Sequence, residues 1–143
     1  VEIDLRVPAL LPEDYLGDVN MRLSFYKRIA GAENKEALDE LKVELIDRFG
    51  LLPEATKNLF QIAELRLSAK QLKIIKIDAT VHGGFLEFSP NADIDPMKFL
   101  NLIKQQPAVF KFDGPTKFRF NCALEQHKVR LEFVADLVKS LLN

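Results

Sequence analysis

The chain has 143 residues, of which 48% are hydrophobic and 29% charged, so it is neither a disordered segment nor a collagen-like repeat. Its net charge of −1 argues against a dedicated binder of nucleic acids or anionic membranes. One cysteine, Cys122, excludes an internal disulfide and a cysteine-based zinc site, and no apolar run is long enough to span a bilayer. Because the sequence opens inside a strand pattern without an initiator methionine, we expect residues 1–143 to be a single domain of a larger protein.

The first half of the chain is predicted to be helical after an extended N-terminal segment, residues 1–17, which begins with a short strand and contains two prolines. Apolar residues at helical spacing predict helices over 19–30, 35–49 and 53–71. Asp18 and Asn34 are suited to cap the first two helices. The apolar stripe expected along the first helix consists of Val19, Leu23, Tyr26, Ile29 and Ala30.

The second half changes to a strand-like period. Residues 73–81 alternate around Ile75 and Ile77, and His82-Gly83-Gly84 forms a turn into a second strand. The remaining predicted elements are a strand over 85–88, a short helix over 95–105, a hairpin over 110–120 and a closing helix over 124–142. This order predicts an α+β fold, with a helical N-terminal half packed with a small antiparallel sheet of hairpins and a closing C-terminal helix.

The hairpin FKFDGPTKFRF places two kinds of side chain on opposite faces. Four phenylalanines, Phe110, Phe112, Phe118 and Phe120, alternate with the bases Lys111, Lys117 and Arg119. Stacking and phosphate contacts would then act on opposite sides of the sheet, which favours a buried aromatic face and a solvated basic face. A nucleic-acid contact through the three bases stays open as an alternative.

Motifs for catalysis or cofactor binding are not found. The sequence has no glycine-rich phosphate loop followed by Lys-Ser or Lys-Thr, so no nucleotide site of that kind is predicted. His82 and His127 lie far apart in the sequence and do not have metal-ligand spacing. We therefore predict no catalytic, cofactor or metal site. A small hydrolase or transferase would require a pocket in which His82 or His127 lies beside a carboxylate.

One helix has an unusual acidic face. Opposite the apolar arc of residues 35–49 on a helical wheel lie Glu36, Glu40, Glu44 and Asp47, within roughly 80° of one another. Acids four residues apart repel, and acids near a helix C-terminus oppose the helix dipole, so helix stability alone does not favour this pattern. The face is either merely solvated or a docking surface for a basic partner.

Four segments resemble, in the same order, the C-terminal domain of bacterial transcription-repair coupling factors, the Mfd family. They are IDLRVPALLP (3–12), RLSFYKRIA (22–30), ELIDRFGLLP (44–53) and DGPTKFRF (113–120). The resemblance extends over essentially the whole chain and is least distinctive over about 72–108. It implies an excised regulatory domain, because the ATP-dependent motor motifs of that family belong to other domains.

The resemblance also implies a function. Members of this family displace stalled RNA polymerase on DNA and recruit the excision-repair protein UvrA in the bacterial cytoplasm. This domain would fold back on the N-terminal UvrA-binding module and mask it, without enzymatic activity, cofactor or membrane contact. The acids of the ELIDRFG segment, here Glu44 and Asp47, would take part in that contact. UvrA, RNA polymerase and DNA would be partners only through the parent protein, and the isolated domain is expected to be monomeric.

Overall fold

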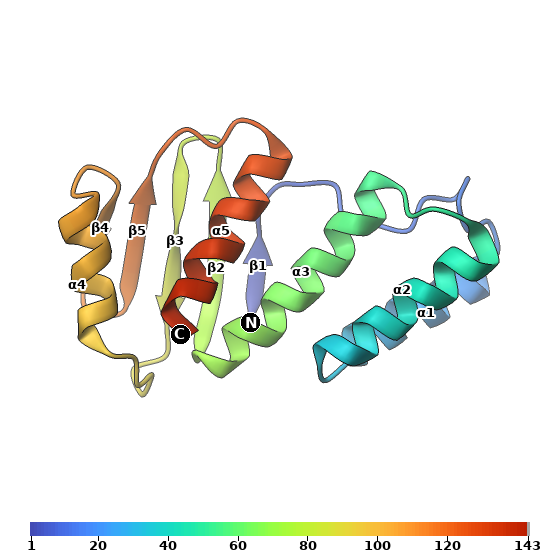
Figure 1. Cartoon of the computed structure of the whole chain (residues 1–143), viewed down its shortest axis with the longest axis horizontal. Helices are drawn as coiled ribbons and strands as arrows, with labels where there is room; N and C mark the ends of the chain where they lie inside the picture. Colours follow the sequence, from blue (N-terminus) through green and yellow to red (C-terminus); the bar gives the residue numbers. More distant parts are fainter. Residues whose placement is uncertain (143) are drawn as a thin grey trace. The chain divides into compact units, whose positions relative to one another are not determined.

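The structure is a computed structural model that describes residues 1–142, which form five helices and five strands in the order β1-α1-α2-α3-β2-β3-α4-β4-β5-α5 (Figure 1). The α+β class predicted from the sequence is confirmed. The described chain divides into two compact units. We call Val7–Leu67 the helical unit, and Val1–Arg6 together with Ser68 onward the sheet unit. That residues 1–143 act as one domain stays a prediction.

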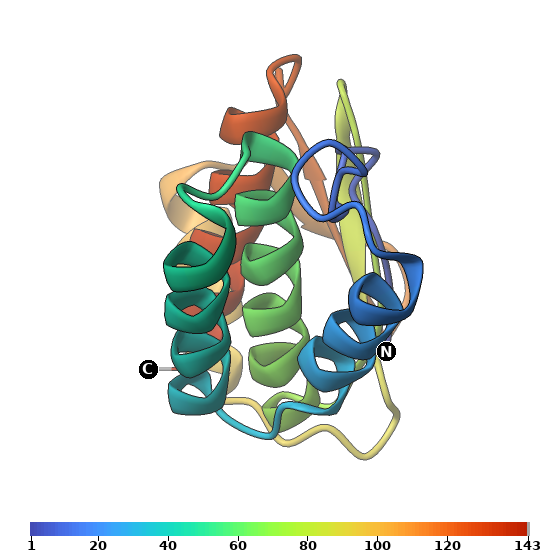
Figure 2. The ribbon, with the colours of Figure 1, turned by 90° about the vertical axis from the view of Figure 1, so that its right-hand side faces the viewer.

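The helical unit contains α1 (Val19–Gly31), α2 (Lys35–Phe49) and most of α3 (Glu54–Gln71), which lie side by side (Figure 2). The predicted caps are present, because the Asp18 carboxylate accepts from the Met21 amide at 2.9 Å and the Asn34 side chain accepts from the Ala37 amide at 2.8 Å. Gly50, at φ +95°, ends α2 in a conformation that favours glycine. The buried core of this unit consists of Leu11, Leu16, Phe25, Ile29, Leu38, Leu41, Leu45 and Phe60.

The buried side of α1 differs from the expected one. Phe25 and Ile29, one turn apart, are buried, whereas Val19 and Leu23 are exposed. The face of α1 that packs in the core is therefore the one with Phe25, whose ring is larger than the side chains of Val19 and Leu23. This side of α1 also holds the extended segment, because the Leu11 amide donates to the Tyr26 hydroxyl at 2.7 Å.

The sheet unit contains one five-stranded sheet. Its strands are β1 (Glu2–Asp4), β2 (Ile74–Thr80), β3 (Gly83–Phe88), β4 (Phe110–Phe112) and β5 (Lys117–Asn121), in the order β1-β2-β3-β5-β4. The predicted antiparallel sheet is mixed, because β1 pairs with β2 in parallel while every other pair is antiparallel. A parallel pair requires a long connection, and three helices lie between β1 and β2 in the chain.

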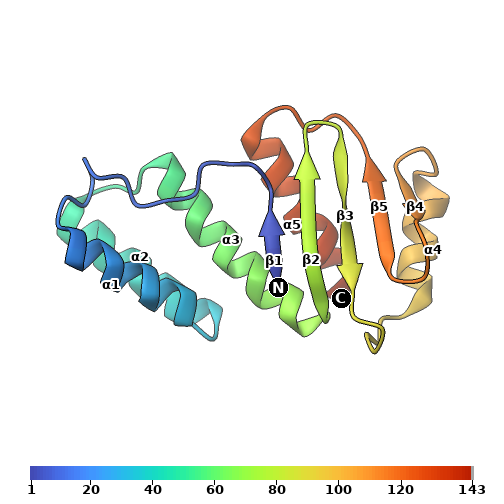
Figure 3. The same ribbon diagram turned by 180° about the vertical axis from the view of Figure 1, so that it is seen from behind.

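Helices α4 (Pro96–Gln105) and α5 (His127–Leu142) lie against one face of this sheet (Figures 1 and 3). Among the described elements of this unit, no helix lies over the other face, which is turned to the viewer in Figure 3. The apolar core therefore lies between the sheet and the two helices. Its fully buried members include Ile77, Leu86, Phe118, Phe120, Leu131, Val134 and Val138.

The turn between β2 and β3 depends on its two glycines. Gly83 adopts φ +128°, and a Cβ on Gly84 would overlap the backbone oxygen of Asp78. The register of the same hairpin shifts between Ile74 and Lys76. Because of this irregularity Ile74 and Ile77 are both buried, whereas Ile75, which simple alternation places on the side of Ile77, is 50% exposed.

The hairpin faces predicted at β4 and β5 are confirmed for three of the four phenylalanines. Phe110, Phe118 and Phe120 are buried, whereas Phe112 is 41% exposed although its ring lies 5.1 Å from that of Phe118. We therefore expect Phe118→Ala to lower the free energy of unfolding by about 3–5 kcal/mol, because it leaves a cavity in the core. Phe112→Ala should cost clearly less.

The measurement is urea unfolding followed by NMR signals of the sheet, so that the sheet unit is monitored directly. Equal losses for the two variants would contradict the burial difference between Phe118 and Phe112.

Candidate functional site

Helix α2 has three distinct sides within the helical unit. Leu38, Leu41 and Leu45 are buried in its core. On one flank the Lys42 ammonium lies 5.7 Å from the ring centre of Phe60 on α3. The third side carries the acidic residues singled out from the sequence, and the structure separates them into two groups.

Glu44 is engaged by α1. Its carboxylate accepts from both terminal nitrogens of Arg28, with Nη1 to Oε2 at 2.7 Å and Nη2 to Oε1 at 3.0 Å. The Arg48 guanidinium lies 3.7 Å from the same carboxylate. The hydrogen bonds from Arg28 hold the pKa of Glu44 below its ordinary value, with the charges of Arg28 and Arg48 acting in the same direction. Glu44 therefore already has a partner inside the helical unit.

The outward line of α2 consists of Glu36, Glu40, Val43 and Asp47, which follow one another at intervals of three or four residues. All four are exposed, and Val43 is 57% exposed. Within residues 1–142, none of the three acids has an ion-pair partner. The structure thus brings together Glu36, Glu40 and Asp47 on one surface, with the apolar side chain of Val43 at its edge. We call these four residues the acidic docking face.

A hollow of about 370 Å³ lies beside this face, where α1 meets α2. Glu40 and Glu44 contribute carboxylates to its walls, and Arg28 contributes the one basic side chain among the lining residues described. A long basic side chain from a partner could enter the hollow and reach Glu40. The spacing of the sequence predicted the acids but not this hollow, because the hollow depends on how α1 packs on α2.

The three bases of the hairpin share the sheet face that carries no described helix of the sheet unit. Lys111 lies opposite Arg119 in the register, and Lys117 follows the same face two residues earlier. Arg119 donates to the Asp113 carboxylate at 2.6 Å, and this bond, with the charges of all three bases, holds the pKa of Asp113 below its ordinary value. Of the three bases, Arg119 is therefore paired with a nearby acid.

An aromatic ring that the sequence analysis did not place there lies on this basic face. The Lys117 ammonium is 4.5 Å from the ring centre of Phe85, and the Arg119 guanidinium is 5.9 Å from it. The four hairpin phenylalanines do not share this face, but β3 supplies a ring to it. Rings and bases are therefore not fully separated, because Phe85 is the register partner of Arg119.

The two histidines and the cysteine that the sequence analysis considered do not belong to the acidic docking face. His82 is exposed in the β2–β3 turn, and His127 is exposed as the first residue of α5. Cys122 is half-buried, and its burial raises the pKa of the thiol. Among residues 1–142, no group of three or more His, Cys, Asp and Glu could hold a metal ion, and no helix is long and apolar enough to cross a membrane.

The Arg28–Glu44 pair predicts a pH dependence. Because the folded-state pKa of Glu44 is lowered, the pair stabilises the fold above the unfolded-state pKa, and this contribution is lost as the pH falls through the folded-state pKa. We expect Glu44→Gln to be less stable than the wild type at pH 7. This difference should shrink as the pH falls below about 4.3.

The measurement is chemical denaturation at pH 7 and at a second pH below about 4.3. Asp47→Asn, which removes an acid without an ion-pair partner in the described chain, is the matched control and should change stability little at either pH. A Glu44→Gln difference that is the same at both pH values would show that the ion pair does not contribute.

Three comparisons identify relatives of this chain. The family model described as the TRCF domain matches residues 5–99. The chain is 65% identical over 140 residues to the transcription-repair-coupling factor of Haemophilus influenzae, and 45% identical over 140 residues to that of Escherichia coli. Each alignment covers 98% of this chain but only 12% of the relative. The chain therefore spans a small part of the length of these relatives.

A solved structure has the same fold. It is described as the crystal structure of the C-terminal domain of transcription-repair coupling factor, and it superposes with a TM-score of 0.84 at 22% identity. The superposition covers 99% of this chain and 91% of that chain. Since the family model matches well over half of the residues, the chain belongs to the TRCF domain family of transcription-repair coupling factors.

Proposed function

We propose that this chain is a non-catalytic, autoinhibitory interaction domain of a transcription-repair coupling factor. In this role it docks through the acidic docking face of α2 on the N-terminal UvrA-binding module of the parent protein and masks the surface that UvrA recognises. The parent would act in the cytoplasm, where its other domains contact RNA polymerase and DNA. The membership of the TRCF domain family supports this setting.

The observation that carries the proposal is the set of acids without partners on α2. Glu36 and Glu40 lie one turn apart and repel each other, and Asp47 lies in the last turn, where the helix dipole disfavours an anion. No base within the described chain forms an ion pair with any of them. These unfavourable electrostatic energies are small, but a basic partner would give all three acids a favourable contact.

Val43 adds an exposed apolar side chain at the edge of the acidic docking face. Protein interfaces combine such apolar contacts with polar groups around them. Glu44 has a different part in this arrangement. Its two oxygens hold Arg28, so it fixes α1 against α2 and thereby the walls of the hollow next to Glu40.

A second candidate function is a nucleic-acid contact through Lys111, Lys117 and Arg119. The position of Phe85 among the bases favours it, since a ring and cations on one face suit a single strand. Asp113 and Asp78 lie on or beside the same face and would repel phosphates. Salt-dependent binding of single-stranded DNA, lost in Lys117→Glu, would support this candidate.

Charge reversal tests the proposed docking. The double variant Glu40→Lys/Asp47→Lys should bind the isolated N-terminal module at least about tenfold more weakly, because like charges across an interface repel. Both side chains are exposed, so thermal stability should change little. Glu13→Lys, an exposed acid of the same unit outside α2, is the control. The measurement is calorimetric titration at low and high salt.

A charge swap separates the role of Glu44 in the fold from a role in docking. Arg28→Glu with Glu44→Arg keeps an ion pair between α1 and α2 while it reverses the charge at position 44. If Glu44 acts through the fold, the swap should bind nearly as well as the wild type.

In the full-length protein, Glu40→Lys/Asp47→Lys should also raise the affinity for UvrA. If the double reversal binds the N-terminal module as tightly as the wild type at low salt, the acidic docking face is only solvated.

A further inference from the structure

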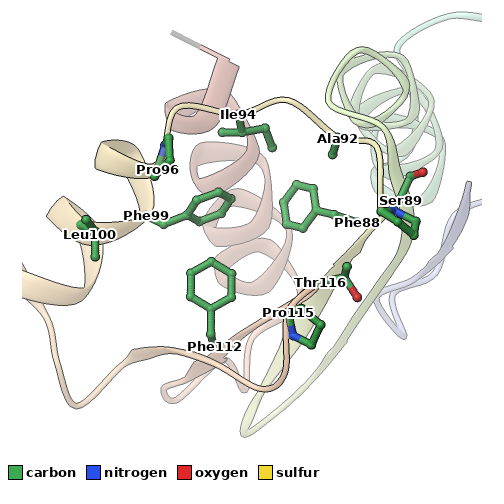
Figure 4. A pocket seen from close by; sticks show the side chains of 11 residues that line it. Phe88, Ser89, Ala92, Ile94, Pro96, Phe99, Leu100, Phe112, Pro115 and Thr116 are labelled. Atoms are coloured by element: carbon green, nitrogen blue, oxygen red, sulfur yellow. The ribbon is translucent and has the colours of Figure 1, made fainter.

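The sheet unit contains an apolar cavity that uses no residue of α2 and that the proposed function does not explain. It has a volume of about 310 Å³ and lies between the loop that follows β3, the helix α4 and the β4–β5 turn (Figure 4). Phe88, Phe99 and Phe112 point toward its interior, with Ile94, Leu100 and Pro115 around them. Its size lies at the lower end of the range for ligand pockets.

Four rings in contact give the cavity a rigid shape. Phe99 lies at their centre, with its ring 5.5 Å from that of Phe88, 5.0 Å from that of Phe112 and 4.9 Å from that of Phe118. Every one of these contacts is edge-on, an arrangement that aromatic pairs favour. The walls are therefore held by the core of the sheet unit, and a side chain that enters meets a preformed surface.

The mouth of the cavity is lined by exposed apolar side chains. Phe112 and Leu100 belong to the walls, yet both are exposed by more than a third, and Met97 lies one turn before Leu100 on α4. Such a group of exposed apolar residues around a concave site is typical of an interaction site rather than of a scattered surface. Phe112 departs from the burial of the other hairpin phenylalanines because it forms this wall.

The loop beside the cavity carries both kinds of charge, because the Lys73 ammonium donates to the Asn91 oxygen at 3.4 Å near two acids of the same loop. Asp93 and Asp95 alternate along the wall segment with Ala92 and Ile94, and both acids are exposed. Asp95 also caps α4 through the Met97 amide, whereas Asp93 has no ion-pair partner among the described residues. Lys104 lies one turn beyond Leu100, at the other end of α4. Ser89 and Thr116 are the polar side chains of the wall.

We propose that this cavity is a docking site for a partner protein, which inserts one bulky apolar side chain from an extended segment and places a basic residue beside it. The apolar walls fit a single aromatic or leucine anchor, as in the central pockets of protein interfaces. The exposed Asp93 is complementary to a neighbouring Lys or Arg of that segment. Leu100 covers the outer side of the anchor.

The test uses a short peptide as the probe. The chain contains no tryptophan, so the fluorescence of a capped Lys-Trp-Lys peptide reports its own burial when the 143-residue protein is added. We expect a saturating blue shift with a Kd on the order of 1 mM, since one anchor supplies little binding energy. Lys-Ala-Lys should not compete, and Glu-Trp-Glu should bind about tenfold more weakly.

Matched variants show whether the peptide binds in the cavity. Leu100→Lys and Asp93→Lys should each weaken Lys-Trp-Lys by about tenfold, because the first removes apolar wall and both add repulsion. Val129→Lys and Asp136→Lys, also exposed positions of the sheet unit but on α5, should leave binding unchanged. Thermal melts of the four variants would check that each of them folds. Absence of saturable binding, equal binding of Glu-Trp-Glu, or full binding by Leu100→Lys would overturn the proposal.

Discussion

A buried arginine, which has no carboxylate partner within residues 1–142, joins distant segments of the sheet unit. The Arg130 side chain donates to the backbone oxygens of Leu124 and Leu5 at 3.0 Å each, and to those of Arg6 and Glu125 at 3.1 Å each. The residue is only 3% exposed, so this charge is stabilised by carbonyl dipoles rather than by an acid. Without it the buried oxygens of Leu124 and Leu5 would lose this partner away from water.

This arginine also determines how the chain begins. Leu5 and Arg6 directly follow β1, so Arg130 joins the first strand to the start of α5, at the other end of the sequence. Arg6 has φ +53° and donates to the carboxylate of Asp78 and the oxygen of Ala79 on β2. Two arginines therefore support the parallel pairing of β1 with β2. Arg6 bonds the end of β1 to β2, and Arg130 bonds it to α5.

In the helical unit a second arginine determines which acids are available. Because Arg28 binds Glu44, the surface that we propose for docking is limited to Glu36, Glu40, Val43 and Asp47. The acidic docking face therefore results from the packing of α1 on α2 and not from the helical wheel alone. The proposed masking of the UvrA-binding module is carried by this face.

Local patterns predicted local structure well. The caps Asp18 and Asn34 and the alternation of the hairpin bases with its phenylalanines depend on neighbouring residues, and they are present in the structure. Features that depend on distant residues were missed. The parallel pairing of β1, the partner of Glu44 sixteen residues away, and the place of Phe85 among the bases each join segments that no sequence period relates. The outward turn of Ile75 was missed because a register shift interrupts its strand.

The most direct test of the account is to map the surface that the N-terminal module touches. Amide chemical shifts of this chain would be recorded while the unlabelled module is added. The account predicts that the largest changes follow the outward line of α2, from Glu36 to Asp47, and weaken as salt screens the acids. Changes confined to β4, β5 and the β4–β5 turn, with α2 unaffected, would contradict it.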